Sequence, residues 1–127
     1  MPKSTIQYWN TLLSENRSHW HPIEGMEGFA EELTLAIDKE SGDYTRLTRF
    51  MAGADTTPFG PKSHSYPEEI LIIEGQLYDG AFDKWLEAGD YASRPPGEVH
   101  GPFKTEVGCL VLEISYPSQS TNEQINA

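Results

Sequence analysis

Short extended segments separated by turn residues make up the sequence from Glu31 to Ser115, and no amphipathic helical stretch lies between them. Apolar residues recur at every second position, as at Leu33, Leu35 and Ile37, which is typical of half-buried strands. The candidate strands cover residues 33–37, 45–51, 69–74, 76–78, 82–86, 90–93 and 109–115. Turn residues are expected at 40–43, 75, 79–80, 89–90, 95–97 and 106–108. The pattern predicts an all-β fold, an antiparallel β-sandwich or barrel.

The segment before the strands predicts one short N-terminal helix. Ser4 or Thr5 can cap it, and apolar residues recur at helical spacing up to about residue 16, at Ile6, Trp9, Leu12 and Leu13. We expect a single domain over residues 1–127, with a helical extension at 1–19 and a polar tail at 118–127.

The charge of the chain excludes several classes of partner. Its 127 residues include 20 acidic and 9 basic side chains, and the formal net charge of -11 repels phosphate backbones and anionic lipid surfaces. We therefore expect neither nucleic acid nor a membrane as a partner. The N-terminus does not resemble a secretion signal, which favours a cytoplasmic protein. The single cysteine, Cys109, lies in an apolar segment and is expected to be buried and unreactive.

Residues 70–73 are apolar at both strand parities, so this strand should be covered on both faces. One face can pack into a barrel interior, and the other needs a second sheet or a partner subunit. The strand therefore predicts a homodimer.

Two segments combine histidine and carboxylate residues at defined spacing. The segment GDYASRPPGEVH, residues 89–100, fits the pattern G-x5-P-x-G-x2-H and ends at His100. The segment PKSHSYPEEILIIEG, residues 61–75, places His64 four residues before Glu68. Imidazole nitrogen and carboxylate oxygen are ligands that borderline divalent metals prefer.

Residues 89–100 resemble the second motif of the cupin superfamily at every fixed position, and residues 61–75 resemble its first motif in part. Counting back from Gly75, the glutamate of the first motif falls on Glu68, its second histidine on His64 and its first histidine on Lys62. Residues 49–117 are similar to small single-domain cupins, in particular the zinc-binding cupin domain of an anti-sigma factor and acetylacetone-dioxygenase-like proteins. The resemblance implies a jelly-roll-like cupin barrel, with residues 20–22 and 28–37 as edge strands.

The resemblance also implies that His64, Glu68 and His100 face a divalent metal ion. Two histidines and one carboxylate on one side of an ion leave positions open for water, substrate or dioxygen. Fe(II) or Zn(II) suits such a site, and Mn(II) or Ni(II) is an alternative. Lys62 departs from the motif. Its ammonium either reaches solvent and leaves the site intact, or pairs with Glu68 in place of a lost metal.

Other residues near the motifs have alternative interpretations. Glu69 would replace Glu68 after a shift of one residue, although the spacing to Gly75 favours Glu68. Tyr66 is a candidate catalytic residue that can hydrogen-bond a ligand or coordinate the metal, but ordinary aromatic packing is the interpretation we favour. Arg94 either binds an anionic substrate or is solvated, as lone arginines at turns usually are. His19 and His21 lie outside both motifs and are expected at the surface.

Three functions fit this sequence. The first is a metal-dependent, oxygenase-like cupin enzyme that uses the His/Glu/His set on a small-molecule substrate. The second is a non-catalytic, sensor-type cupin that binds a metal or a small-molecule ligand. The third is a cupin with a degenerate, metal-free site. Fold alone does not separate them.

Overall fold

The computed structural model describes residues 3–4 and 8–121, and in these residues it confirms the all-β expectation. The only helices there are three short 3-10 helices, η1 (Ser14–His19), η2 (Thr57–Phe59) and η3 (Pro117–Gln119). The strands are β1 (His21–Pro22), β2 (Ala30–Ile37), β3 (Tyr44–Phe50), β4 (Glu68–Asp79), β5 (Lys84–Glu87), β6 (Tyr91–Arg94), β7 (Phe103–Lys104) and β8 (Cys109–Ser115).

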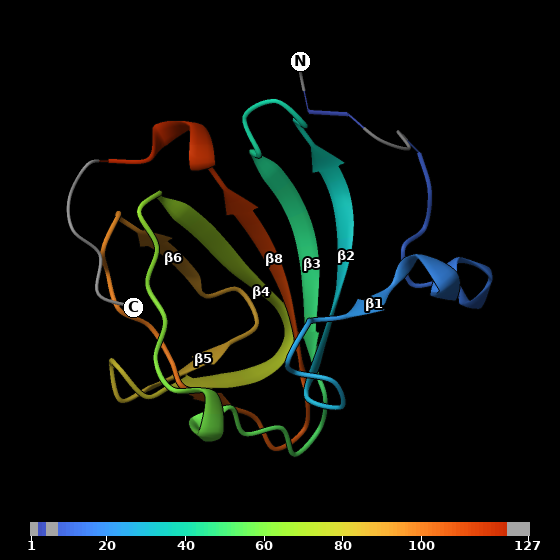
Figure 1. Ribbon diagram of the computed structural model, residues 1–127. Coiled ribbons are helices and arrows are strands. Elements are labelled where there is room, and N and C mark those ends of the chain that lie inside the picture. Colours follow the sequence, from blue (N-terminus) through green and yellow to red (C-terminus); the bar gives the residue numbers. More distant parts are fainter. Residues whose placement is uncertain (1–2, 5–7, 122–127) are drawn as a thin grey trace.

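All strand pairs are antiparallel, and the sheet order is β1-β2-β3-β8-β4-β5. β6 pairs with the first part of β4, whereas β5 and β7 pair with its last part. The first part of β4 therefore lies between β8 and β6 and its last part between β5 and β7, and the curled strands form an open half-barrel (Figure 1). The segment that contains η2 runs across the open side of this half-barrel (Figure 1).

Gly75 lies inside β4, so the prediction of a turn at this position is wrong. The strand continues from Glu68 to Asp79 with a register shift between Ile72 and Glu74, and Gly75 has φ 81°. A Cβ at Gly75 would lie 1.9 Å from the backbone oxygen of Gly108. Glycine here bends the strand and lets β8 approach it closely, so one long strand can follow the curvature of the barrel.

The predicted N-terminal helix begins later than expected and is a 3-10 helix. Residues 8–13 are not helical and η1 starts at Ser14, while residues 5–7, including the predicted helical position Ile6, lie outside the described residues. The side chain of Asn10 accepts a hydrogen bond from the backbone N–H of Leu12 at 2.9 Å. This local bond offers the backbone an alternative to a helical turn.

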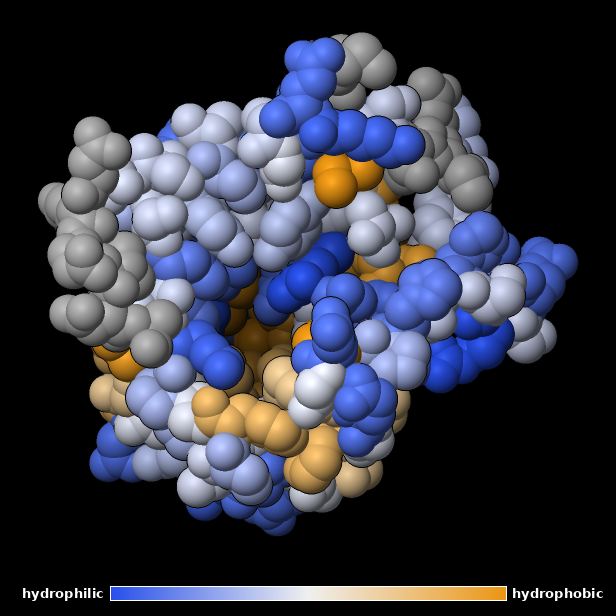
Figure 2. All heavy atoms as spheres, viewed as in Figure 1, coloured by the Kyte–Doolittle hydropathy of each residue, from blue (hydrophilic) through white to orange (hydrophobic). Residues whose placement is uncertain are grey.

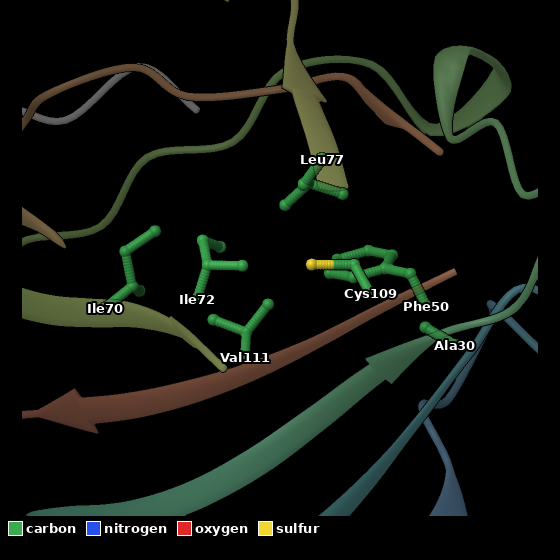
Figure 3. Close-up of a cluster of buried hydrophobic side chains, with 7 residues drawn as sticks. All are labelled: Ala30, Phe50, Ile70, Ile72, Leu77, Cys109 and Val111. Atoms are coloured by element: carbon green, nitrogen blue, oxygen red, sulfur yellow. The ribbon is translucent and has the colours of Figure 1, made fainter. Parts of the chain in front are cut away.

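The inner face of the sheet changes from polar to apolar along the strands. Cross-strand pairing places three rows one above another: Tyr44, Ser115 and Glu68; Arg46, Glu113 and Ile70; Thr48, Val111 and Ile72. Ile70, Ile72 and Val111 of these rows belong to the buried core cluster, whose other members are Ala30, Phe50, Leu77 and Cys109 (Figure 3). Cys109 is 3% exposed, as expected, and its burial raises the pKa of the thiol to about 12. The polar rows therefore stand directly above an apolar core.

The outer face of β4 remains open in the single chain. Ile70 and Ile72 are buried, but Leu71 and Ile73 are 38% and 44% exposed, and Tyr91 beside Leu71 is 57% exposed. The expected cover of this second face is not provided by the part of the chain that the structure describes.

The polar tail predicted at 118–127 is only partly described, because residues 122–127 lie outside the described residues. Ser118, within η3, donates both its backbone N–H and its hydroxyl to the carboxylate of Asp43, at 2.8 and 2.6 Å. The start of this segment is thus fixed against the turn between β2 and β3. Among the helices that the structure describes, none has the length and hydropathy required to cross a bilayer.

Candidate metal centre

The fold brings His64, Glu68 and His100 together on the inner side of the half-barrel. Each offers one ligand atom, and these atoms all lie within 4.8 Å of one another. His64 Nε2 lies 3.8 Å from Glu68 Oε2, and the two imidazole centroids are 5.1 Å apart. Ligands bonded at roughly 2.1 Å to one ion stand about 3–4 Å apart, so a small contraction of this cluster would enclose a divalent metal. The donor set and its spacing fit such an ion.

Paired loops position the two histidines. His64 precedes β4, and His100 lies between β6 and β7. The backbones of Lys62 and His100 exchange two hydrogen bonds, of 2.8 and 2.9 Å, and Gly97 donates its N–H to the carbonyl of His64 at 2.9 Å. These bonds join two loops that are far apart in the sequence, which fixes the histidines relative to each other.

Each imidazole is held in an orientation suited to metal binding. His100 Nδ1 lies 3.3 Å from the carbonyl oxygen of Glu98, and His64 Nδ1 lies 3.4 Å from that of Tyr66. A proton on each Nδ1 leaves Nε2 as the acceptor. Burial lowers the pKa of His100 to about 4, with help from Arg94 and His64, so this imidazole is neutral at neutral pH. Neutral imidazole is the form that binds a metal.

Glu68, and not Glu69, faces the cluster. Glu68 is 4% exposed, whereas Glu69 points to the other side of β4 and accepts hydrogen bonds from Tyr91 and Tyr116 at 2.6 and 2.7 Å. Burial raises the pKa of Glu68 and the charge of Glu113 adds to this, while Arg94 acts in the opposite direction. The Ser115 hydroxyl donates to Glu68 Oε2 at 3.0 Å. This carboxylate is fixed in place by its neighbours.

Arg94 is buried, so the expectation of a solvated arginine is wrong. Its guanidinium donates to Glu68 Oε1 at 3.1 Å and lies 3.8 Å from Asp79 Oδ2. Asp79 also accepts the backbone N–H of Gly101, next to His100, at 2.8 Å. Arg94 is the last residue of β6 and the direct cross-strand partner of Glu68, which places its side chain on the inner face. Sequence reasoning missed Asp79, whose only signal was its position at the end of β4.

A cavity of about 340 Å³ opens beside the cluster. Its apolar wall is formed by Ile23, Met26, Phe50, Phe59 and Phe103, and its polar wall includes Tyr44, Arg46, Thr48 and Glu113 as well as the three candidate ligands. In Figure 2 this side of the molecule is hollowed, with an apolar floor and a largely hydrophilic rim. The volume lies at the small end of the range for ligand pockets, about 300–1,000 Å³, so the cavity suits a small molecule.

A family model described as the ChrR Cupin-like domain matches residues 10–118. The chain belongs to this cupin family. The match confirms the cupin resemblance read from the two motifs. No curated protein sequence matches the chain.

Solved structures of cupins have the same fold. An RmlC-like cupin from Shewanella frigidimarina is 19% identical, with 92% of this chain and 95% of that chain covered and a TM-score of 0.68. KdgF from Halomonas sp. is 20% identical, with 80% and 89% covered and a TM-score of 0.65. An acetylacetone dioxygenase from Acinetobacter johnsonii is 18% identical, with 91% and 77% covered and a TM-score of 0.63. At these identities the likeness establishes the fold alone.

Lys62 stands where the first histidine of the cupin motif is expected. It is exposed, although it lines the cavity mouth, and the ion-pair partner of Glu68 is Arg94. The alternative in which Lys62 pairs with Glu68 is therefore wrong, because the buried guanidinium already occupies the position beside that carboxylate. The solvent-directed alternative for Lys62 agrees with this cupin structure.

Of the remaining candidate residues, Tyr66 lies in the cavity, whereas His19 and His21 lie at the surface. Tyr66 lines the cavity and stacks on His64, with ring centroids 4.4 Å apart and an interplanar angle of 2°. Burial raises its pKa, so its hydroxyl stays protonated and can donate a hydrogen bond to a ligand. His19 and His21 are exposed, as expected, and lie outside the cluster.

Proposed function

We propose that this cupin is a metal-dependent enzyme that acts on a small molecule in an oxygenase-like reaction. The observation that carries the proposal is the cluster of His64, Glu68 and His100 beside the 340 Å³ cavity. Two histidines and one carboxylate would hold the ion from one side and leave its cavity-facing positions for substrate and dioxygen. Fe(II) or Zn(II) is the ion proposed, with Mn(II) or Ni(II) as alternatives, and only a redox-active ion supports oxygenation.

The residues around the cluster have defined roles in this proposal. The bound ion would supply Lewis acidity and, as Fe(II), activation of dioxygen. Neutral His100 and Glu68 would provide its lone pairs, and Arg94 orients the Glu68 carboxylate and opposes the rise in its pKa. The aromatic wall of Phe50, Phe59 and Phe103 excludes water from the substrate. The reaction we propose is of the dioxygenase type, in which both atoms of dioxygen enter the substrate and the substrate supplies the electrons; one solved structure of the same fold is an acetylacetone dioxygenase.

A non-catalytic binding module is the second candidate. The ion pair between Glu68 and Arg94 favours it, because a guanidinium bound to a ligand carboxylate withdraws negative charge from a metal that must activate dioxygen. A module would bind a metal or a small molecule without turnover.

Metal content tests the proposal first. Protein purified without a histidine tag and loaded with Zn(II) or Fe(II) should contain one ion per chain, measured by elemental analysis. His64→Ala and His100→Ala should lose it, while the exposed His19→Ala and His21→Ala serve as matched controls. If the wild-type protein takes up no ion, the result contradicts the proposal and supports a cupin with a degenerate, metal-free site.

Oxygen uptake separates the enzyme from the module. Fe(II)-loaded protein should consume dioxygen with at least one member of a panel of β-diketones and small thiols, and His100→Ala should not. Complete silence of the loaded wild-type protein favours the module.

We also propose that the protein is a cytoplasmic homodimer. The buried free thiol of Cys109 suits a reducing compartment. The exposed Leu71, Ile73 and Tyr91 offer an apolar face for a second copy, whose apolar character is typical of homodimer interfaces.

A further inference from the structure

The cavity has a second polar cluster, separate from the three candidate metal ligands. Glu113 on β8 and Arg46 on β3 are direct cross-strand partners and line the same cavity as His64 and Glu68. Arg46 Nε donates to Glu113 Oε1 at 2.5 Å, and the Thr48 hydroxyl donates to the same oxygen at 2.7 Å. Arg46 Nη1 donates a further hydrogen bond to Glu32 Oε2 at 2.5 Å, and Glu32 does not line the cavity.

Burying this second polar cluster in a barrel interior costs desolvation free energy. The Glu113 side chain is only 12% exposed and that of Arg46 25% exposed. A buried ion pair is often no more stable than well-packed apolar side chains of the same volume. Ile70 completes the row of Arg46 and Glu113, and Val111 and Ile72 lie in the next row, so apolar residues fit this wall. Ligand binding therefore explains this second polar cluster better than a contribution to the stability of the fold does.

Glu113 lines the cavity and keeps one carboxylate oxygen without a hydrogen bond among the described residues. Both of its described hydrogen bonds end on Oε1, so Oε2 retains its lone pairs for another donor. Oε2 is not among the buried, unpartnered atoms of the described residues, where only Ser63 Oγ is found. Because a carboxylate oxygen can only accept a hydrogen bond, it requires a donor on the ligand, and a hydroxyl is a donor that leaves the charge of a monoanionic ligand unchanged.

We propose that Glu113 recognises a hydroxyl group of the ligand, and that the ligand is a small hydroxy acid whose carboxylate binds at the metal. This inference rests on the proposed function, since it assigns the acid end to the metal cluster. Arg94 and Arg46 offset two of the four carboxylates that contact them, and a divalent ion would offset the other two, so Lys62 leaves the site with one net positive charge. A monoanionic ligand fits that charge.

The strand register sets the length of the ligand. Glu113 lies two residues along β8 from Ser115, the cross-strand partner of Glu68. Two residues of a strand span about 7 Å. A chain of four or five carbons with a terminal hydroxyl bridges a separation of this order.

Matched pairs of acids test the hydroxyl subsite. The probes are 4-hydroxybutyrate against pentanoate, and 5-hydroxypentanoate against hexanoate, in which a methyl group replaces the hydroxyl. Binding to Zn(II)-loaded protein is measured by calorimetry. A hydrogen bond to a charged acceptor makes one hydroxy acid about tenfold tighter than its partner acid.

Variants locate the effect. Glu113→Gln keeps the shape of the side chain but removes its charge. Glu113→Asp keeps the charge but moves the carboxylate back by one methylene group. In both variants the hydroxy acid and its matched alkyl acid should bind with nearly equal affinity. Glu32→Gln breaks the other half of the Arg46 bridge without changing the cavity lining, and should preserve the discrimination.

Zinc content and melting temperature are measured on the same samples. A folded protein without zinc contradicts the proposed function, and the inference fails with it. Zinc-loaded wild-type protein overturns the inference alone if it binds each pair equally, or binds no hydroxy acid at millimolar concentration. Discrimination that persists in folded Glu113→Gln and Glu113→Asp overturns it as well.

Discussion

Arg94 Nη1 lies 3.1 Å from Glu68 Oε1, and the two residues are direct cross-strand partners on β6 and β4. Their side chains are 6% and 4% exposed. The candidate metal-binding carboxylate is therefore already paired with a buried cation supplied by the neighbouring strand. This pair links the stability of the apoprotein to the same atoms that would hold the ion.

Replacing Arg94 should strongly destabilise the metal-free protein. Arg94→Met keeps most of the side-chain volume but leaves the carboxylate of Glu68 buried without a cation, which costs about 3–5 kcal/mol. The free energy of unfolding in urea, measured with a chelator present, checks this value. Zn(II) should then stabilise the variant more than the wild type, because the ion supplies positive charge to the same carboxylate.

Arg17→Met is the matched control for that experiment. Arg17 also pairs with a glutamate, Glu31, at 2.5 Å, but its side chain is 61% exposed. The Glu31 side chain is 9% exposed, but Arg49 Nε also lies 4.0 Å from its carboxylate, so loss of the exposed Arg17 should cost only about 1 kcal/mol. Equal effects of the two substitutions would contradict the buried-pair argument.

The metal-free protein should lose stability as the pH falls from about 6.5 to about 4. The pKa of His100 drops from 6.5 to about 4 on folding, so between these values the unfolded chain binds more protons than the folded protein. This group contributes up to about 3 kcal/mol, present above pH 6.5 and lost by pH 4. Glu68 acts in the opposite sense, because its raised pKa lets the folded state hold a proton more tightly.

His100→Gln isolates the histidine contribution to this pH dependence. Urea unfolding at a series of pH values should give a flatter curve for the variant than for the wild type. His19→Gln changes an exposed histidine and should leave the curve unchanged. A wild-type slope that survives in His100→Gln would assign the pH dependence to other groups.

Gly75→Ala should destabilise the protein by about 3 kcal/mol or more, since the new Cβ would clash with the Gly108 carbonyl and the backbone φ is positive. Gly89→Ala is the matched control. Gly89 also has a positive φ, of 93°, but a Cβ there would meet no atom within 4 Å. Its cost should be about 1 kcal/mol. Thermal unfolding of both variants measures the difference, and similar losses would argue against close strand approach at Gly75.

A charge on the outer face of β4 should prevent dimerisation. Light scattering coupled to size exclusion should give a dimer for the wild type and a monomer for Leu71→Asp and Ile73→Asp, because two copies cannot bury facing carboxylates. Val107→Asp changes an apolar residue that is 70% exposed elsewhere and should remain dimeric. A monomeric wild-type mass would refute the proposed interface.

The strands with strong alternation could be predicted well from the sequence. The prediction for residues 109–115 coincides with β8, and that for residues 45–51 differs from β3 by one residue at each end. β7 was missed because its two residues form a strand only through pairing with the end of β4. The split of β4 at Gly75 failed because glycine marks turns and strand bends alike, and only the approach of Gly108 separates them.

The candidate site was predictable where motif spacing determined it. His64, Glu68 and His100 do come together, and Glu69 is turned away by strand parity. The roles of Arg94, Asp79 and Glu113 depended on which strands are neighbours. Arg94 pairs with Glu68 because β6 lies beside β4, and Glu113 faces Arg46 because β8 lies beside β3. The order of the strands in the sheet cannot be predicted from the spacing of residues in the sequence.

The reciprocal backbone hydrogen bonds between Lys62 and His100 have an evolutionary consequence. They hold the position of the missing cupin histidine next to an existing candidate ligand, independent of which side chain occupies it. Histidine at position 62 would therefore add a fourth candidate ligand by a single amino-acid replacement. The number of candidate ligands can thus change at one position without a change in the barrel around it.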